Sequence, residues 1–256
     1  IDAAAAGVNG PAGSTRVLAW NRDADSVSPT NGDFPHRLAP YAHLDFTAGA
    51  FSGLTVQTLG GNDTVDVVSF DAADARLNTV TVAGEAGDDV LSVASTNGAA
   101  VTVTLDGGDG HDTLQVGVVS NFRGTVPNPS PHTLDAIGTV TITGDLGRDT
   151  LVVDDRLSAG VNTYALTATS VGRGPAAITY GTVERLTLQA GTGDDTFAID
   201  GLAGNSAVTV LEEGTGTATL NFTDYGAGGV QVDLDTTAVQ SLSGTATGPY
   251  LQLDGF

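Results

Sequence analysis

Residues 101–116 read VTVTLDGGDGHDTLQV, and residues 79–93 read TVTVAGEAGDDVLSV. Each stretch begins with alternating apolar and Thr residues, passes through a Gly-rich turn that ends in Asp, and continues as a second apolar segment. Alternation with a period of two is typical of a β-strand with one buried and one exposed face. Both stretches therefore predict the same unit, which is a strand, a tight turn and another strand.

Alignment on the last Asp of the turn shows further copies of this unit. The aligned residues are Asp63, Asp89, Asp112, Asp149 and Asp195, and a Gly stands two residues before each of them. Apolar residues recur seven residues before this Asp and two and four residues after it: Val56, Val82, Leu105, Ile142 and Leu188, then Val65, Leu91, Leu114, Leu151 and Phe197, then Val67, Val93, Val116, Val153 and Ile199. A sixth copy keeps Gly216 and the apolar residues Leu211, Leu220 and Phe222, and has Ala218 in place of the Asp.

The spacing of the copies predicts the size of one coil. Successive Asp positions lie 26, 23, 37 and 46 residues apart, and the step from Asp195 to Ala218 is 23. The gap of 46 is twice 23 and its midpoint falls in a turn at 172–175, while the gap of 37 holds a polar, Pro-rich stretch at 120–131 that predicts a loop. We expect an all-β fold, a parallel β-solenoid (β-helix) of about 23 residues per coil with six to seven coils. Its aligned positions from 63 to 218 should form one column.

Two regions are expected. Residues 1–50 do not follow the register and hold the only Trp of the chain, so they predict an irregular N-terminal cap or adapter. Residues 51–256 predict the solenoid domain. The sequence begins at Ile1 and ends just after an apolar strand at 251–253, so we expect a processed protein or a piece of a longer one.

Composition excludes several functions. The 256 residues carry a net charge of −21 and include no Lys, Cys or Met. Nucleic-acid binding is disfavoured because the phosphate backbone requires a basic surface. Without Cys there are no disulfides or thiolate metal sites, and without a long apolar run no membrane insertion is expected. The acidity is equally consistent with bound divalent cations and with the acidic surface of a protein from a salty habitat.

One turn carries a resemblance to a known family. Residues 107–115, GGDGHDTLQ, match the nonapeptide GGxGxDx(apolar)x at every fixed position, and residues 190–198 depart from it only at the first Gly. The turn resembles the RTX (hemolysin-type) calcium-binding repeat. The segment 162–195 also resembles repeats of giant bacterial surface proteins, such as adhesins and matrix proteins.

The resemblance implies calcium as the cofactor, held by turn carbonyls and the repeat Asp. The implied ligands are Asp63, Asp89, Asp112, Asp149 and Asp195, with the neighbouring Asp88, Asp109 and Asp194 as further ligands. Calcium takes six to eight oxygen ligands, which stacked turns of this kind could supply. RTX nonapeptides follow one another every nine residues, whereas here one turn occurs per coil, so the resemblance does not extend to the coil geometry. The alternative is that each Asp caps its own turn by accepting backbone amides.

The expected function is structural. We expect a non-enzymatic module of an extracellular fibre, matrix or adhesin, secreted or at the cell surface. Its partners would be further copies joined head to tail into a filament or neighbouring modules of a longer chain, and glycans are another candidate. The alternatives are a carbohydrate-active β-helix enzyme, a polysaccharide lyase or hydrolase, and a ligand-binding adhesin tip. The absence of Lys and the few Arg residues disfavour a lyase.

Overall fold

The computed structural model describes residues 15–21, 42–46, 52–69, 77–96, 101–119, 130–131, 133–202, 208–212, 216–222, 240–241 and 250–254. These ranges consist of β-strands and connecting turns, with one short 3-10 helix, η3 (Leu134–Ala136). No helix in them is long and apolar enough to cross a membrane. The prediction of an all-β fold with parallel strands is confirmed.

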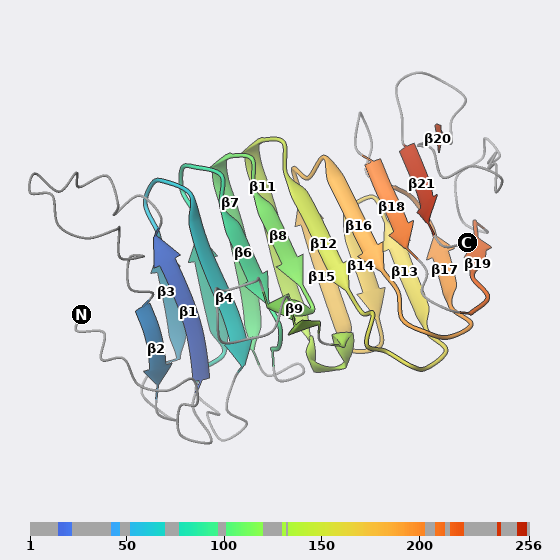
Figure 1. Ribbon diagram of the computed structural model, residues 1–256, viewed down its shortest axis with the longest axis horizontal. Helices are drawn as coiled ribbons and strands as arrows, with labels where there is room; N and C mark the ends of the chain where they lie inside the picture. Colours follow the sequence, from blue (N-terminus) through green and yellow to red (C-terminus); the bar gives the residue numbers. More distant parts are fainter. Residues whose placement is uncertain are drawn as a thin grey trace, which may run out of the picture.

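Two large sheets lie face to face and extend along the long axis of the molecule (Figure 1). Sheet A contains, in spatial order, β2 (Ala42–Phe46), β1 (Thr15–Asn21), β4 (Asp63–Ser69), β6 (Val90–Val93), β8 (Thr113–Val116), β12 (Thr150–Asp154), β16 (Arg185–Gln189), β18 (Val208–Glu212), β21 (Tyr250–Asp254) and β20 (Gln240–Ser241). Sheet B contains β19 (Thr219–Asn221), β17 (Thr196–Ile199), β13 (Thr163–Thr167), β14 (Ser170–Arg173), β15 (Ala176–Gly181), β11 (Thr139–Gly147), β7 (Thr102–Gly110), β5 (Thr79–Ala83) and β3 (Gly53–Gln57). A small third sheet pairs β9 (Val118–Val119) with β10 (Ser130–Pro131).

The chain alternates between the two large sheets. It passes from β3 in sheet B to β4 in sheet A, returns to β5, and repeats this path through β12, and equivalent strands of successive passes pair in parallel. The pairing aligns Val82 with Leu105 in sheet B and Leu91 with Leu114 in sheet A. The sequence repeat therefore becomes a spatial repeat, in which each pass lies against the next.

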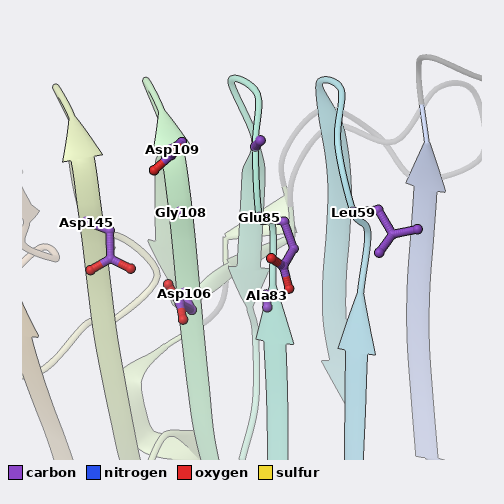
Figure 2. A pocket seen from close by; sticks show the side chains of 8 residues that line it. Leu59, Ala83, Glu85, Asp106, Gly108, Asp109 and Asp145 are labelled. Atoms are coloured by element: carbon purple, nitrogen blue, oxygen red, sulfur yellow. The ribbon is translucent and has the colours of Figure 1, made fainter.

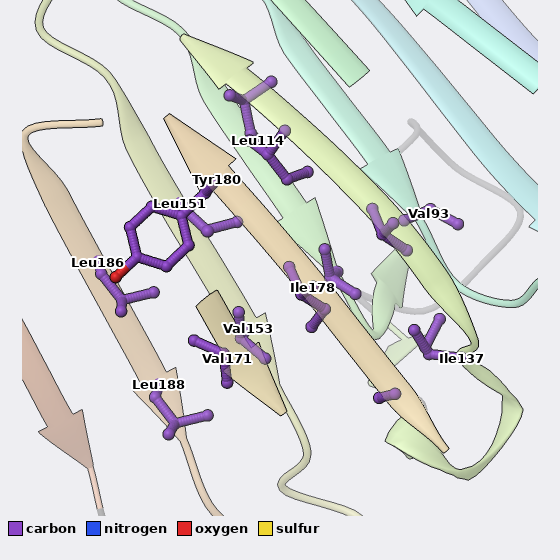
Figure 3. Close-up of a cluster of buried hydrophobic side chains, with 14 of the residues drawn as sticks. Val93, Leu114, Ile137, Leu151, Val153, Val171, Ile178, Tyr180, Leu186 and Leu188 are labelled. Atoms are coloured by element: carbon purple, nitrogen blue, oxygen red, sulfur yellow. The ribbon is translucent and has the colours of Figure 1, made fainter. Parts of the chain in front are cut away.

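A continuous apolar core fills the space between the sheets (Figure 3). The fifteen apolar positions of the five Asp-containing copies are buried, whereas Leu220 and Phe222 of the sixth copy are only partly buried. Burial alternates along the strands, because successive side chains of a strand point to opposite faces. The inward-facing Val, Leu and Ile residues thus supply the hydrophobic stabilisation, and one pass alone could not bury them.

The repeat is interrupted between Asp149 and Asp195. Here β13, β14 and β15 follow one another as an antiparallel meander within sheet B, where earlier passes contribute one strand. The predicted coil turn at 172–175 is wrong, because it is the tip of the β14–β15 hairpin, where Gly174 has a φ of 55°. The 46 residues thus hold one further pass, from β15 to β16, which the β13–β14–β15 meander lengthens.

The sheet that follows the repeated turn differs before and after the meander. Asp63, Asp89, Asp112 and Asp149 precede or begin strands of sheet A, whereas Asp195 precedes β17 in sheet B. The predicted single column is therefore confirmed for the first four positions. It is wrong for Asp195 and Ala218, which lie together at the opposite edge of the sheets.

The described part of the predicted cap belongs to sheet A. Strand β1 pairs antiparallel with β4, and β2 pairs antiparallel with β1, so the sheet continues past the first repeat. The rest of residues 1–50 lies outside the described ranges. So does 120–129, which makes up most of the predicted loop at 120–131.

Candidate functional site

The repeated aspartates form a hydrogen-bonded ladder along one edge of the two sheets, which we call the aspartate ladder (Asp63, Asp89, Asp112 and Asp149). Each of these residues is 1% exposed. The Asp63 amide donates to Asp89 Oδ1 at 2.7 Å, and the Asp89 amide donates to Asp112 Oδ1 at 2.8 Å. The Asp112 amide donates to Asp149 Oδ1 at 2.8 Å. One carboxylate oxygen per turn is thus used to join that turn to the preceding one.

Glu184 ends this ladder, and sequence alignment did not identify it. Its Oε2 accepts the Asp149 amide at 2.7 Å, which is the role that an Asp has in the earlier passes. The turn before Glu184 lacks the Gly-x-Asp pattern. Glu184 is identified instead by the register of β16 on β12, which pairs Arg185 with Thr150 and so places Glu184 beside Asp149.

Glycine is required where the buried carboxylates pack against the chain. A Cβ atom added at Gly84 would lie 2.3 Å from Asp89 Oδ2, and one at Gly107 would lie 2.3 Å from Asp112 Oδ2. Real Cβ atoms do not approach other atoms this closely. These glycines therefore create the space that the ladder carboxylates occupy.

Three ladder residues, Asp89, Asp112 and Asp149, each keep a second carboxylate oxygen that is buried. Asp89 Oδ2, Asp112 Oδ2 and Asp149 Oδ2 have no hydrogen-bond partner among the described residues. The pKa of Asp89 is raised to about 7 and that of Asp112 to about 6. Burial is the largest cause, and the charges of neighbouring ladder carboxylates contribute to the rise. Burial also raises the pKa of Asp149. The ladder therefore binds protons far more readily than exposed carboxylates do.

These pKa values predict that the fold is more stable in mild acid. Unfolded carboxyls release their protons near pH 3.8, whereas Asp89 and Asp112 hold theirs to about 7 and about 6. Between those limits the folded chain binds more protons than the unfolded chain, so the free energy of unfolding falls as the pH rises. We expect a higher melting temperature at about pH 5 than at about pH 8, and a smaller difference in Asp89→Asn, which removes one titrating group. Equal pH dependence in both proteins would show that Asp89 does not titrate in this range.

The exposed acidic candidates also accept backbone amides from a neighbouring turn. Asp88 Oδ1 accepts the His111 amide at 2.9 Å, and Asp194 Oδ1 accepts the Thr217 amide at 2.9 Å. At the opposite edge, Asp195 Oδ1 accepts the Asn162 amide at 2.7 Å. The alternative prediction that each Asp caps its own turn is therefore wrong for these residues, because their carboxylates accept backbone amides of an adjacent pass.

Asp109 differs, because it lines a shallow acidic groove on the surface (Figure 2). The groove has a volume of about 360 Å³ and is lined by Leu59, Ala83, Glu85, Ala86, Asp106, Gly108, Asp109 and Asp145. Burial and a side-chain contact with Asp145 raise the pKa of Asp106. The groove therefore gathers carboxylates from three successive passes.

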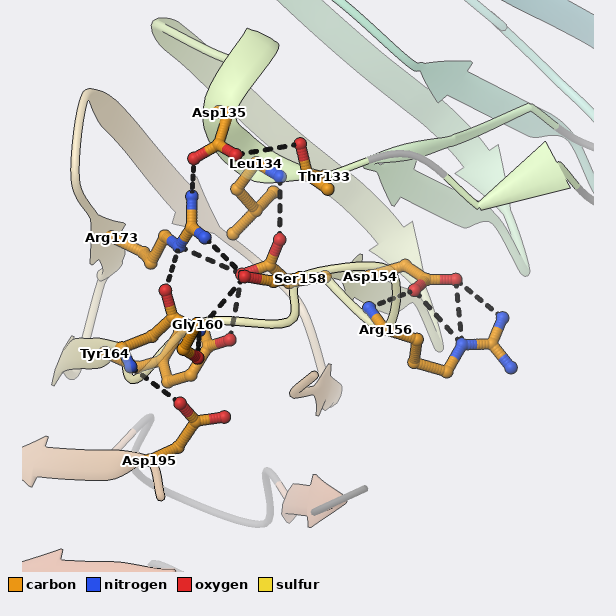
Figure 4. Close-up of polar contacts among 12 residues, drawn as sticks. Thr133, Leu134, Asp135, Asp154, Arg156, Ser158, Gly160, Tyr164, Arg173 and Asp195 are labelled. Atoms are coloured by element: carbon orange, nitrogen blue, oxygen red, sulfur yellow. Dashed lines mark hydrogen bonds and ion pairs between the residues drawn. The ribbon is translucent and has the colours of Figure 1, made fainter. Parts of the chain in front are cut away.

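A buried polar cluster holds the inserted hairpin in place (Figure 4). The Arg173 Nε lies 3.0 Å from Asp155 Oδ2, and both side chains are buried. Arg173 Nη2 donates to Ser158 Oγ at 2.7 Å, and the Tyr164 hydroxyl donates to Asp155 Oδ2 at 2.8 Å. Asp155 Oδ1 also accepts the Leu134 amide at 2.8 Å. The cluster thus ties η3, β13, β14 and the 155–158 segment together where the repeat is broken.

The fit of calcium to these residues is partial. Partnerless carboxylate oxygens are the donors that calcium prefers. However, no three His, Asp or Glu side chains of the described residues converge as a metal site. Backbone carbonyls would have to supply most of the ligands, and calcium binding at the candidate aspartates stays a prediction.

Comparison with known proteins gives no family for this chain. No family model matches it, and neither a curated protein nor a solved structure shows significant similarity to it. The resemblance to RTX repeats therefore depends on the turn motif at 107–115.

Proposed function

We propose that this chain is a structural module of an extracellular fibre, matrix or adhesin, built as a parallel β-solenoid. The observation that carries the proposal is the aspartate ladder, in which the repeated Asp side chains form hydrogen bonds between one pass and the next. Buried carboxylates are costly unless they are hydrogen-bonded. Their repeated use at contacts between passes supports a role in rigidity, and the resemblance of the turn at 107–115 to RTX repeats supports a location outside the cell.

The module would join its partners through the ends of its sheets. Strand β3 is the last described strand of sheet B and pairs with β5 on one side. A strand at the end of a sheet can pair with another chain, and head-to-tail contacts of this kind propagate into filaments. Both further copies of the chain and neighbouring modules of a longer chain are compatible with such a contact.

Electron microscopy and light scattering across a concentration series test this proposal. Self-association should give rods that lengthen with concentration, and Gln57→Lys on the terminal strand β3 should shorten them, because charged residues hinder strand addition. Gln189→Lys, on the interior strand β16, is the matched control. If Gln57→Lys does not change the length of the rods, the contact between copies lies elsewhere. If the protein is a monomer at all concentrations, self-association is wrong and the chain would act as a module of a longer chain.

The acidic groove favours one alternative, a carbohydrate-active enzyme. A carboxyl with a raised pKa beside a second carboxyl is a common arrangement in glycoside hydrolysis. Asp106 and Asp145 contact each other, and the pKa of Asp106 is raised. The test is an assay for reducing ends released from neutral or acidic polysaccharides. Activity in the wild-type chain that is lost in Asp106→Asn would support the enzyme and contradict the purely structural role.

Calcium enters the proposal as a stabiliser of the charged ladder. A cation and a proton would compete for the partnerless Oδ2 atoms, so calcium should act most strongly where the carboxyls are ionised. We expect millimolar calcium to raise the melting temperature of metal-stripped protein at about pH 8, by the equivalent of about 2.7 kcal/mol at 100 times the Kd, and to act less at about pH 5. Asp112→Asn should weaken the effect, whereas the exposed Asp200→Asn should not. An unchanged melting curve at pH 8 would remove calcium from the proposal.

A further inference from the structure

The outer face of sheet B carries an unbroken row of hydroxyl side chains. The pairing of seven adjacent strands places side by side Thr55, Thr81, Thr104, Thr141, Thr179, Ser170 and Thr167. These residues alternate with buried ones along their strands, so their side chains point away from the core. Adjacent strands lie about 4.8 Å apart, so the row extends for about 29 Å.

A second row lies beside the first on the central strands. Strands β5, β7 and β11 each begin with Thr-Val-Thr. The register pairs Thr79 with Thr102. It also pairs Val103 with Val140, so Thr139 lies beside Thr102. Two residues along a strand span about 6.6 Å. Thr hydroxyls and methyls thus form a two-dimensional array with repeats of about 4.8 Å and about 6.6 Å. We call this array the hydroxyl face.

The hydroxyl face is preorganised. Each Thr of the three central strands flanks a Val that is at most 1% exposed, namely Val80, Val103 or Val140. Thr is β-branched, which restricts its side-chain rotamers. At one end of the row the Thr167 and Ser170 hydroxyls contact each other at 2.7 Å. Little side-chain freedom would be lost on binding, which favours affinity for a regular partner.

The other face of the molecule shows that this array is not a general property of the strands. The equivalent outward row of sheet A joins Thr64, Val90, Thr113, Thr150 and Arg185. It therefore mixes apolar, hydroxyl and charged side chains. The hydroxyl face has no charged residue in either row, although the chain has a net charge of −21.

This chemistry selects a particular kind of partner. A charged polymer finds no complementary charge on the two rows, and packing against another sheet requires interdigitating apolar side chains. Sugar rings are commonly held by exposed aromatic residues, and the aromatic residues of the neighbouring strands, Tyr164, Tyr180 and Phe197, are buried. A neutral lattice of hydrogen-bonding groups with repeats close to those of the array fits best. Hexagonal ice presents such a lattice on its prism face.

We propose that the hydroxyl face of sheet B binds ice. The rows of Thr methyls and hydroxyls order water into positions that continue the crystal lattice. This activity goes beyond the structural role proposed above and does not depend on it.

Ice partitioning tests the inference. Protein in a slowly growing ice hemisphere is compared with protein in the remaining liquid, and thermal hysteresis is measured in parallel. We expect the wild-type chain to be enriched in the ice and Thr104→Lys, in the centre of the array, to fall to the level of a non-binding protein. Thr113→Lys, in the same pass but on sheet A, is the matched control and should partition like the wild type. Circular dichroism establishes that both variants fold, and Thr81→Tyr replaces Thr104→Lys if the latter does not.

Two results would overturn the inference. One is exclusion of the wild-type chain from ice, and the other is equal partitioning of the Thr104→Lys and Thr113→Lys variants. Binding to crystalline cellulose or chitin in the absence of ice binding would also overturn it, by assigning the hydroxyl face to a polysaccharide.

Discussion

Gly110→Ala is expected to destabilise the fold by about 3–5 kcal/mol, the sum of backbone strain and overpacking. Gly110 has a φ of 151°, a conformation that L-residues with a side chain rarely adopt. An added Cβ would also lie 1.9 Å from the Gly87 carbonyl oxygen of the preceding pass. The two passes would have to separate, and the ladder bond between Asp89 and Asp112 would be strained. Urea unfolding followed by circular dichroism measures the loss.

Two other glycines separate the causes. Gly181→Ala adds a Cβ in open space at an ordinary φ, so it should change the stability by less than about 0.5 kcal/mol. Gly174→Ala also meets open space but has a φ of 55°, so it should cost about 1 kcal/mol through backbone strain alone. If Gly110→Ala costs no more than Gly174→Ala, the close approach of successive passes does not constrain the fold.

Arg173→Leu is expected to cost about 3–5 kcal/mol, because it leaves a buried carboxylate without its cation. The Arg173 and Asp155 side chains are 7% and 0% exposed, and the guanidinium also bonds Ser158. Loss of these contacts should loosen the β13–β14–β15 meander before the regular passes unfold. Thermal unfolding and limited proteolysis near residues 155–175 measure both effects.

A double variant identifies the source of that cost. Arg173→Leu with Asp155→Asn removes the uncompensated charge and should recover part of the lost stability. The exposed Arg185→Leu on β16 is the surface control and should change the stability by less than about 0.5 kcal/mol. A double variant less stable than Arg173→Leu alone would show that hydrogen bonding, and not the buried charge, determines the cost.

The regular part of the fold could be predicted because each repeat contains, within its own sequence, the pattern that determines its strands and its turn. Each pass repeats the same alternation and the same turn, so aligning the turns places Leu91, Leu114 and Leu151 in one buried column without knowledge of distant contacts. The repeated Gly of the turns permits a positive φ, and Gly87, Gly110 and Gly147 have one, whereas Gly193 does not. Their second role, close approach to the preceding pass, depends on stacking and is not visible in one repeat.

The position of Asp195 could not be predicted, because the turn motif does not encode which sheet follows it. The same Gly-x-Asp turn leads into sheet A at Asp149 and into sheet B at Asp195. The gap of 46 residues between Asp149 and Asp195 equals twice the repeat, so counting residues concealed the meander within it. Glu184 was missed for a related reason, since its role follows from the pairing of β12 with β16 and not from a motif.

The sequence predicted that the repeated Asp residues lie at turns, but the contacts of their carboxylates were not predicted. An Asp at a turn suggests a calcium ligand or a cap of its own backbone, whereas the ladder residues accept amides 23 to 37 residues away. The Arg173–Asp155 ion pair could not be predicted either, because no sequence motif or spacing links two residues that meet only after the meander folds.

Residue-resolved amide hydrogen exchange tests the aspartate ladder most directly. The Asp63, Asp89 and Asp112 amides should be protected to the same degree as strand amides of the core, because they donate to buried carboxylates. In Asp112→Ala, the Asp89 amide should lose its protection while the Asp63 amide, whose acceptor is Asp89, keeps it. If the Asp89 amide exchanges as fast as an exposed turn amide in the wild-type chain, or is unaffected by Asp112→Ala, the repeated aspartates do not join successive passes and the ladder does not exist in solution.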